Sequence, residues 1–588
     1  MNDKANTKII QKYQGTLFPD STEVETFKDQ SRFLRGTLRE SFADPITGSI
    51  AEADTQLIKF HGTYQQDDRD LRLSRQEKKL EPAYSFMIRV RVPGGDLTAK
   101  QWIKLDDISD SYANRTLKLT TRQAVQFHGV IKFKLKETIQ SMDEALLDSI
   151  AACGDVNRNV MCTPDPSLSP IHSLIFPWAE KISKHLLPKT RAYHEIWLDE
   201  GLGDGKKLVN EKPNEDEPLY GKHYLPRKFK IGIAIPPNNC ADVYTNDVGL
   251  VAIVKDKKLL GFNVAVGGGM GMTFGREDTY PALARDVAFT KPEKLLDIVT
   301  RIVEIQRDYG DRSDRKRARL KYTLENLGFD VFKSKLEERL GYTLEKAKKV
   351  NFTSSSDQFG WHQDSNSLWH LMLFVEHGRV KDTGKQQQKK ALREIAKLDL
   401  CGFRLTGNQH LLLTNIRDSD KNKINAILKN YDLSADEDNL SGMRRNAIAC
   451  VAMNTCPLAM AEAERYLPDL ISKIEPILLK NNLFKDEIKI RMTGCPNGCG
   501  RSVMGEIGFI GKSHGRYNVY LGSSHNGDRL NKLYRENLNE NEILQELDTL
   551  LSQYANQRND AEHFGDFVIR KGYVEACDQG LNFHKTTV

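Results

Sequence analysis

An internal duplication is the feature that most restricts how this chain of 588 residues can fold. The frame Leu-Thr-x-x-Gln begins at Leu119 and occurs again at Leu405, 286 residues further on. Asn-Arg-Asn around Arg158 corresponds to Arg-Arg-Asn around Arg445, 287 residues further on. Because repeated sequence folds into repeated units, we predict a molecule with two related halves.

The similarity continues in the same order, but the equivalent residues are separated by fewer residues in sequence. Pro-Pro-Asn-Asn-Cys ends at Cys240, and Cys-Pro-Asn-Gly-Cys ends 259 residues later at Cys499. Phe-Asn-Val at Phe262 corresponds to Tyr-Asn-Val at Tyr517, 255 residues later. Extra residues in the first copy explain the decrease, and the charged Gly- and Pro-containing stretch 201–218 is the expected loop. A ligand between the halves would contact both copies.

The local patterns indicate a mixed α/β protein. Segments 85–92 and 229–235 have strand patterns, whereas 292–309 and 460–481 have helical ones. The chain is too long for one core, so we expect three or four packing units. The first seventy or so residues show no clear period and are expected to form an arm that packs on another domain or subunit.

Composition restricts the class of protein and its compartment. No segment approaches the ~18–20 consecutive apolar residues of a membrane helix, and the first residues lack the apolar core of a signal peptide. We therefore expect a cytoplasmic protein. The excess of 86 basic over 80 acidic residues is too small to indicate nucleic-acid binding by itself. Nine cysteines in so long a chain do not form a disulfide scaffold.

Four of the cysteines form two close pairs. Five residues separate Cys450 from Cys456, three separate Cys495 from Cys499, and 38 lie between the pairs. Zinc sites prefer two to four residues within a pair, whereas four thiolates around an iron-sulfur cluster tolerate more varied spacing. The spacing therefore favours a cluster, with zinc and buried unreactive thiols as the alternatives. The scattered cysteines and Cys240, the repeat equivalent of Cys499, are expected to be structural.

The sequence around these cysteines resembles a known family. CVAMNTCPLAMAEAERYLPDL and RMTGCPNGCGR are similar to the cluster signatures of the sirohaem-dependent sulfite and nitrite reductases, most closely the haemoprotein (beta) subunits of NADPH-dependent assimilatory sulfite reductases. FHGTYQQDDRD, TRQAVQFHG, RNVMCT, YLPRKFK and HFGDF extend the resemblance over nearly the whole chain. It implies an α+β (mixed α/β) fold with two ferredoxin-like half-domains and two larger mixed α/β domains.

The resemblance also implies domain boundaries and a reaction. We expect an arm over 1–80, half-domains over 81–150 and 351–430, and repeat domains over 151–350 and 431–588, the last with the cluster. The implied reaction is the six-electron reduction of sulfite to hydrogen sulfide, in sulfate assimilation and cysteine biosynthesis. The implied cofactors are sirohaem and a [4Fe-4S] cluster on Cys450, Cys456, Cys495 and Cys499, with Cys499 also the axial ligand of the sirohaem iron.

Basic residues suit a site for a polycarboxylate tetrapyrrole and a small dianion. Arg89 and Arg91 lie two apart, as do Lys228 and Lys230, so strand alternation directs each pair to one face. Arg312, Arg315, Lys316 and Arg319 have helical spacing, which predicts a basic stripe on a helix. Without the resemblance, an exposed strand face, a solvated helix or a nucleic-acid patch would account for these patterns.

The resemblance assigns roles to these cations. It implies that sulfite is bound by Arg89, Arg158, Lys228 and Lys230. It implies that sirohaem is bound by Arg91, Lys118, Arg122, Gln126, His128, Arg227, Arg319, Asn497 and Arg501. Lys118 stands where the family leads us to expect arginine, and Arg319 where we expect lysine. The charge is therefore better supported than the specific contact at both positions.

Electrons are expected to come from another protein. The segment GGGMGMTFG at Gly267 lacks the G-x-G-x-x-G frame of dinucleotide sites and is expected to be a turn after a strand. The resemblance implies a flavoprotein (alpha) partner that carries FAD and FMN and oxidises NADPH, with ferredoxin as the alternative donor. A sirohaem nitrite reductase and, from another class, a cluster-containing nucleic-acid-binding protein are the competing functions.

Overall fold

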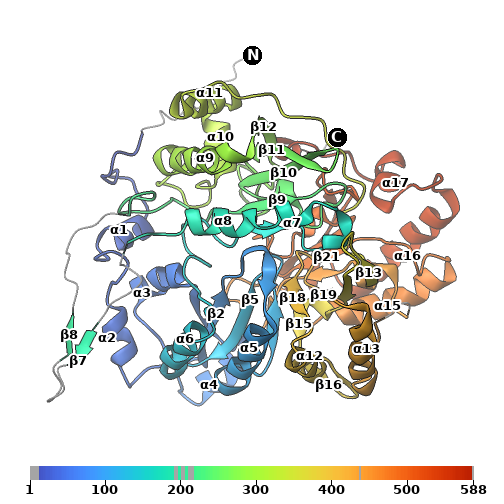
Figure 1. The fold of residues 1–588 in the computed structure, drawn as a ribbon, viewed down its shortest axis with the longest axis horizontal. Coiled ribbons are helices and arrows are strands. Elements are labelled where there is room, and N and C mark those ends of the chain that lie inside the picture. The colour runs from blue at the N-terminus through green and yellow to red at the C-terminus, as the bar shows by residue number, and fades with distance from the viewer. Residues whose placement is uncertain (1–11, 191–196, 200–205, 209–216, 436–438, 586–588) are drawn as a thin grey trace.

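The structure is a computed structural model that describes residues 12–190, 197–199, 206–208, 217–435 and 439–585. Most of the loop expected at 201–218 therefore lies outside the described residues. The chain folds into several sheets flanked by helices (Figure 1). The mixed α/β prediction is confirmed.

Two five-stranded sheets confirm the duplication. The first has the order β6-β9-β10-β11-β12 and the second β20-β21-β22-β23-β24. In both, the first three strands pair in parallel and the last two pairings are antiparallel. The strands are β6 (Met161–Cys162), β9 (Ile231–Ala234), β10 (Val248–Lys255), β11 (Lys258–Val266), β12 (Arg285–Thr290), β20 (Ile448–Ala449), β21 (Ile490–Thr493), β22 (Ile507–Ser513), β23 (Arg516–Leu521) and β24 (Lys532–Leu538).

Two smaller antiparallel sheets form the ferredoxin-like half-domains, and each contains one short strand from the other copy. The first has the order β1-β2-β5-β4-β15 and the second β13-β14-β19-β18-β3. Their strands are β1 (Thr63–Asp67), β2 (Tyr84–Val90), β3 (Asp96–Leu97), β4 (Leu117–Leu119), β5 (Val125–Val130), β13 (Gly360–Gln363), β14 (Trp369–Leu373), β15 (Arg379–Val380), β18 (Gly402–Leu405) and β19 (Leu411–Ile416). This exchange holds the half-domains side by side (Figure 1).

Apolar packing follows the same division. Both half-domains share one core, in which Trp102 of α5 (Ala99–Tyr112) stacks on Phe403 with ring centroids 4.8 Å apart. The first large sheet packs against α8 (Trp178–His185), α9 (Leu295–Tyr309), α10 (Leu320–Leu327) and α11 (Phe329–Leu340). The second packs against α15 (Leu467–Lys480), α16 (Glu540–Gln557) and α17 (Phe564–Arg570). Helices α12 (Gln388–Lys397) and α13 (Lys421–Asn430) belong to the second half-domain.

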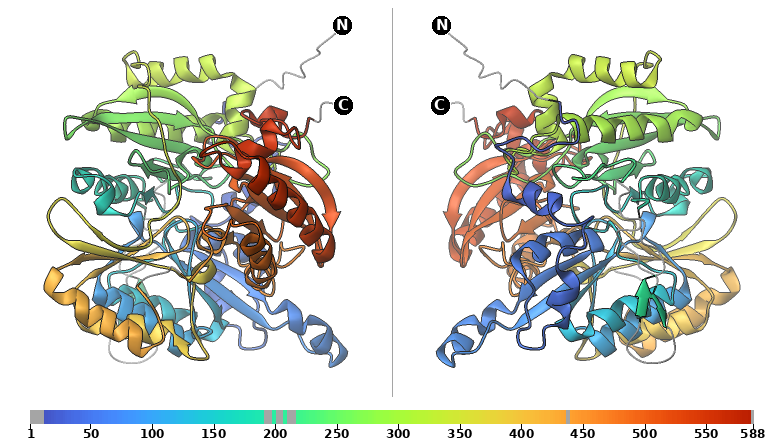
Figure 2. Two further views of the ribbon diagram at one scale, coloured as in Figure 1. Left: turned by 90° about the vertical axis from the view of Figure 1, so that its right-hand side faces the viewer. Right: turned by 90° about the vertical axis from the view of Figure 1, so that its left-hand side faces the viewer.

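The first part of the N-terminal arm packs on other domains, whereas β1, which lies inside the arm expected over 1–80, is the edge strand of the first half-domain sheet. This first part contains α1 (Glu23–Asp29), α2 (Leu38–Ala43) and α3 (Glu52–Leu57), and it runs along one side of the molecule (Figure 2). Glu25 accepts a hydrogen bond from Arg312 at 2.6 Å, and both side chains are buried. Further on, α4 (Arg72–Glu77) is preceded by a segment that contacts the second copy.

The basic stripe predicted over 312–319 is wrong. Helix α9 ends at Tyr309 and α10 begins at Leu320, so the segment between them is a series of turns. Arg312, Arg315 and Arg319 each pair with a different buried carboxylate, of Glu25, Asp155 and Asp247 respectively. Spacing alone could not reveal these long-range partners. Among the described residues, no helix is long and apolar enough to cross a membrane.

Candidate functional site

The second large sheet brings the two cysteine pairs together. Cys450 follows β20 and Cys495 follows β21, and these strands are parallel neighbours, so their carboxyl ends share one edge. The backbone N–H of Cys450 donates to Met492 O at 3.2 Å. The backbone N–H of Gly494 points at Cys450 Sγ from 3.4 Å. Two segments more than forty residues apart in sequence therefore form one site.

A glycine allows the loop of Cys456 to close on this edge. The backbone N–H groups of Met460 and Ala461 both donate to Gly494 O, at 2.7 and 3.1 Å. A Cβ on Gly494 would lie 2.5 Å from Ala461 O. Only glycine permits this approach, so the residue before Cys495 positions the loop that carries Cys456.

The arrangement of the sulfurs favours a cluster over zinc. Tetrahedral Zn–S bonds of about 2.3 Å would place the sulfurs about 3.8 Å apart. Among the described residues, no three cysteine sulfurs lie within 4.8 Å of one another. Burial and then the charge of Cys499 raise the pKa of Cys456 to about 11, and the pKa of Cys450 is also raised for these reasons. Four thiolates at this site therefore need a cationic centre such as iron, and the residues fit a cluster.

Loops of the first copy lie directly over the second cysteine pair. Thr121 Oγ1 donates to Cys499 O at 3.0 Å, and the backbone N–H of Met272 donates to Pro496 O at 2.9 Å. A Cβ on Gly271 would lie 3.2 Å from Asn497 O. Asn497 in turn donates to Cys495 Sγ at 3.4 Å. The site thus lies between the two copies, as the duplication predicted.

Lys228 and Lys230 of the first copy lie close to Cys499. Burial, then the nearby charges of Arg227, Arg158 and Arg319, lower the pKa of Lys228 to about 7. Burial and the charge of Lys228 lower the pKa of Lys230 further below its usual value. Cys499 opposes both shifts and is the exposed member of the cysteine set. An anion beside Cys499 would therefore be strongly favoured.

Three arginines of the expected cofactor set join these lysines. Burial lowers the pKa of Arg122 to about 9 and that of Arg227 to about 10. Arg122 donates to Asn159 O at 2.5 Å and to Ile231 O at 3.2 Å, and its Nε has no partner. Arg319 forms a bidentate pair with Asp247 at 2.9 and 2.7 Å.

Arg89 and Arg158 are also brought together, through residues that sequence reasoning missed. Arg89 Nη1 contacts Cys153 Sγ at 3.0 Å. Arg158 Nη2 donates to Tyr64 Oη at 3.4 Å, and Tyr64 lies within electrostatic range of both Arg89 and Cys153. Tyr64 stands on β1, inside the segment FHGTYQQDDRD that carried part of the resemblance, but the pattern did not distinguish it.

Two other expected residues, Gln126 and His128, lie beside this group. The two side chains are 3.3 Å apart, and His128 Nδ1 is buried without a hydrogen-bond partner. Burial, followed by the charges of Arg379 and other neighbours, keeps the pKa of His128 well below its usual range. Lys118 is fully buried and bonds Glu464 at 2.6 Å, and Glu464 N–H donates to Cys450 O. Lys118 is thus connected through Glu464 to the loop that carries Cys450.

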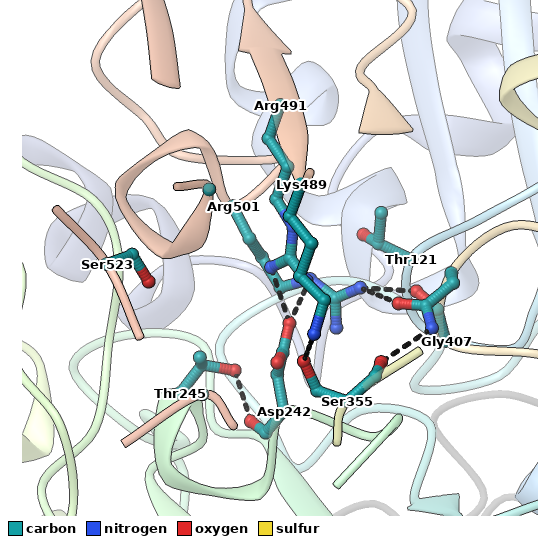
Figure 3. Close-up of polar contacts among 12 residues, drawn as sticks. Thr121, Asp242, Thr245, Ser355, Gly407, Lys489, Arg491, Arg501 and Ser523 are labelled. Carbon is teal, nitrogen blue, oxygen red and sulfur yellow. Dashed lines mark hydrogen bonds and ion pairs between the residues drawn. The ribbon is translucent and has the colours of Figure 1, made fainter. Parts of the chain in front are cut away.

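Arg91 and Arg501 have different surroundings. All three nitrogens of the Arg91 guanidinium are taken, two by Asp148 and one by Ser183 at 2.9 Å. Arg501 is buried between the copies. Its Nη2 donates to Gly407 O at 2.5 Å and its Nη1 has no partner (Figure 3).

A polycarboxylate cofactor fits these side chains. The lowered pKa values of Lys228, Lys230, Arg122 and Arg227 come from burial and mutual repulsion, which bound carboxylates would relieve. Arg122 Nε and His128 Nδ1 are buried polar atoms without a partner. Such atoms are costly unless a ligand satisfies them.

One contact to the cluster loop was also missed. Arg69, in the N-terminal arm, donates from Nη1 to Cys456 O at 3.0 Å and to Ala459 O at 2.6 Å. Its backbone N–H donates to Asn454 O at 3.1 Å. Nothing in the local sequence predicts contacts across nearly four hundred residues.

Comparisons with known families agree with this geometry. The nitrite/sulfite reductase ferredoxin-like half domain matches residues 78–145 and 362–431. The nitrite and sulphite reductase 4Fe-4S domain matches residues 178–344, in the first copy.

Similar proteins cover nearly the whole chain. The sulfite reductase [NADPH] hemoprotein beta-component of Anoxybacillus flavithermus is 56% identical over 96% of this chain and 98% of its own. That of Bacillus subtilis is 53% identical over 98% of this chain and 100% of its own. The structure of the Mycobacterium tuberculosis NirA protein has a TM-score of 0.76 at 24% identity, and covers 95% of this chain and 97% of its own.

Proposed function

Because the chain belongs to the nitrite and sulfite reductase family, we propose that it reduces sulfite to hydrogen sulfide by six electrons at the site between its two copies. The observation that carries the proposal is the group of buried cations beside Cys499. Sirohaem and the [4Fe-4S] cluster, when bound, supply the electron chemistry. The chain supplies position, charge and protons.

Arg89, Arg158, Lys228 and Lys230 are the residues proposed to bind sulfite. Four cations suit a dianion whose oxygens must be held while they are lost as water. Lys228 is suited to proton delivery because its pKa of about 7 lets it give and regain a proton near neutral pH. Arg158, held by Gly154 O at 3.1 and 3.2 Å, stays charged and positions the anion.

The remaining residues are proposed to hold the cofactors. Cys450, Cys456, Cys495 and Cys499 would bind the cluster, with Cys499 shared with the sirohaem iron. The carboxylates of sirohaem would be bound by Arg122, Gln126, His128, Arg227, Arg319, Asn497 and Arg501, with Arg91 and Lys118 acting through the contacts described above. We also propose the domain boundaries expected from sequence; the two large sheets lie within 151–350 and 431–588, whereas β1 and the exchanged strands β3 and β15 fall outside the segments expected for their sheets.

The electron donor is proposed to be an alpha flavoprotein that carries FAD and FMN and oxidises NADPH. The name "beta-component" of the relatives supports a partner of this kind. We also propose a cytoplasmic location and a role in cysteine biosynthesis.

Steady-state rates on two anions test the substrate. The holoenzyme, reduced by a dye donor, should show a higher kcat/KM for sulfite than for nitrite, because two lysines attract a dianion more than a monoanion. A clear preference for nitrite would overturn the choice of sulfite while leaving the family assignment in place.

A further inference from the structure

A buried ion triad joins both half-domains to the segment that carries the proposed cluster. Glu464 Oε1 accepts from Arg379 Nε at 2.6 Å, and Glu464 Oε2 accepts from Lys118 Nζ at 2.6 Å and from Arg379 Nη2 at 3.2 Å. The side chains of Glu464, Arg379 and Lys118 are only 12%, 13% and 2% exposed. We propose that the surplus positive charge of this triad raises the reduction potential of the [4Fe-4S] cluster, an inference that rests on the proposed function.

The exchanged strand β15 places the two cations of the triad side by side. Arg379 of β15 is the register partner of Lys118 on β4. Like charges directly opposite each other on neighbouring strands destabilise a sheet. Glu464 bonds both cations and so offsets their repulsion. The strand exchange therefore brings a cation of the second copy into the first half-domain, where the segment after Cys456 supplies the carboxylate that holds it.

Hydrogen bonds fix both cations in place. Arg379 Nη1 donates to Thr116 Oγ1 at 3.0 Å, and its other two nitrogens donate to Glu464. Lys118 Nζ donates to His377 O as well as to Glu464. Because these charges are buried, solvent and salt screen them much less than they screen surface charges.

The triad is connected directly to the cluster site. Glu464 follows Cys456 by eight residues, and its backbone N–H donates to Cys450 O at 3.1 Å. Lys118 lies within electrostatic range of the Cys450 thiol. The triad therefore acts on the cluster from the side of Cys450, whereas the lysines proposed to bind sulfite lie close to Cys499.

The net charge of the triad favours a reduced cluster. Burial would raise the pKa of Glu464, but the charges of Lys118 and Arg379 lower it well below its usual value. Two cations thus share one carboxylate, which leaves one positive charge in excess. A cluster gains one negative charge on reduction, and its potential depends on the net charge of its surroundings. The excess cation therefore stabilises the reduced form and raises the potential.

Arg379 is the residue on which the surplus charge depends. Its guanidinium stays protonated even when it is buried. Burial lowers the pKa of Lys118, and the charge of Glu464 opposes that shift. Without Arg379, Lys118 and Glu464 would form a pair with no net charge. Arg379 is accordingly a positioning residue that acts on the cluster through the charge it adds to this pair.

A redox titration of the cluster in the holoenzyme tests the inference. The purified protein is poised at a series of potentials with redox mediators, and the reduced cluster is quantified by EPR spectroscopy. Arg379→Gln should shift the midpoint to a more negative potential, so the ratio of reduced to oxidised cluster at the wild-type midpoint should fall several-fold. Arg379→Lys keeps the charge and should have a midpoint close to that of the wild type.

Arg393→Gln is the matched control. Arg393 also joins the two half-domains, but it bonds Asp106 and Asp107, each at 2.7 Å, instead of Glu464. Its midpoint should equal that of the wild type. Lys118→Gln is a second test of the charge, and it should shift the midpoint in the same direction as Arg379→Gln.

Iron and acid-labile sulfide are measured in every sample, which separates this inference from the proposed function. Equal midpoints in the wild type, Arg379→Gln and Lys118→Gln would overturn the inference while the cluster content supports the proposed function. An equal shift in Arg379→Gln and Arg379→Lys would also overturn it, because geometry and not charge would then set the potential. A wild type without iron and sulfide would overturn the proposed function and this inference with it.

Discussion

Asp242 and Arg501 occupy equivalent positions in the two copies, 259 residues apart, and their side chains pair with each other. Arg501 Nε lies 3.1 Å from Asp242 Oδ2, which also accepts from Arg491 Nη1 at 2.6 Å (Figure 3). The duplicated position has thus diverged into opposite charges, and the pair joins the copies beside the proposed site.

Removing the charge of Asp242 should destabilise the protein. Asp242→Asn leaves Arg491 and Arg501 buried without a counter-ion, and breaking a buried pair in this way costs about 3–5 kcal/mol. The thermal midpoint of the holoenzyme should fall by several degrees. Asp278→Asn, which removes an exposed partner of Arg276, is the control and should change it little. Equal midpoints for the two variants would contradict this interpretation.

Arg69 should protect the cluster. Arg69→Ala removes two hydrogen bonds to the loop of Cys456, each worth about 1.5–3 kcal/mol for a charged donor. The visible absorption of the cluster should therefore bleach several-fold faster in air than in the wild type. Arg75→Ala removes a half-buried arginine of the same arm, which donates to Glu81 O and not to the loop of Cys456, and should bleach at the wild-type rate. If both variants bleach at the same rate, the hydrogen bonds from Arg69 do not protect the cluster.

Lys228 should make sulfite binding depend on pH. The pKa of Lys228 is lowered to about 7, so its ammonium form is present below that pH and is lost as the pH rises through it. Bound anions will move this transition upward. The KM for sulfite should therefore rise on the alkaline side. Lys228→Arg keeps its charge, and its profile should be flatter, while the exposed Lys222→Arg should follow the wild type. Sulfite itself also titrates, but this affects the wild type, Lys228→Arg and Lys222→Arg equally. Identical profiles for the wild type and Lys228→Arg would exclude this role.

Arg122 should contribute to retention of sirohaem. Arg122→Ala removes a buried cation with an unpaired Nε, so the affinity for the polycarboxylate should fall about tenfold or more. The check is the sirohaem content per chain after purification and dialysis. Arg115→Ala, an exposed arginine seven residues earlier, should keep the wild-type content. Full occupancy in Arg122→Ala would argue against the assignment.

Much of this architecture could be predicted from sequence. The repeated frames at Leu119 and Leu405 predicted two related halves because equivalent strands need equivalent patterns, and both pairs of sheets confirm it. The cysteine pairs could be assigned to one site because four thiols at two close spacings are typical of the ligands of an iron-sulfur cluster.

Contacts between distant segments could not be predicted. Arg312, Arg315 and Arg319 have helical spacing, yet turns direct each to a different carboxylate. Strands β3 and β15 are exchanged between the half-domain sheets, and Arg69 bonds the loop of Cys456. Both features depend on how the copies pack, which local periodicity does not encode. Tyr64 and Asp247 were missed because their roles come from the arginines that they contact.

The most direct test of the account is the visible absorption spectrum of the purified protein and of Cys499→Ser. We predict sirohaem bands in the wild type and a changed or lost sirohaem spectrum in Cys499→Ser, because that thiol is proposed to join the two cofactors. Cys240→Ser, at the buried repeat-equivalent position, should keep the wild-type spectrum. A wild type without sirohaem bands, or a Cys499→Ser spectrum identical to that of the wild type, would contradict the account.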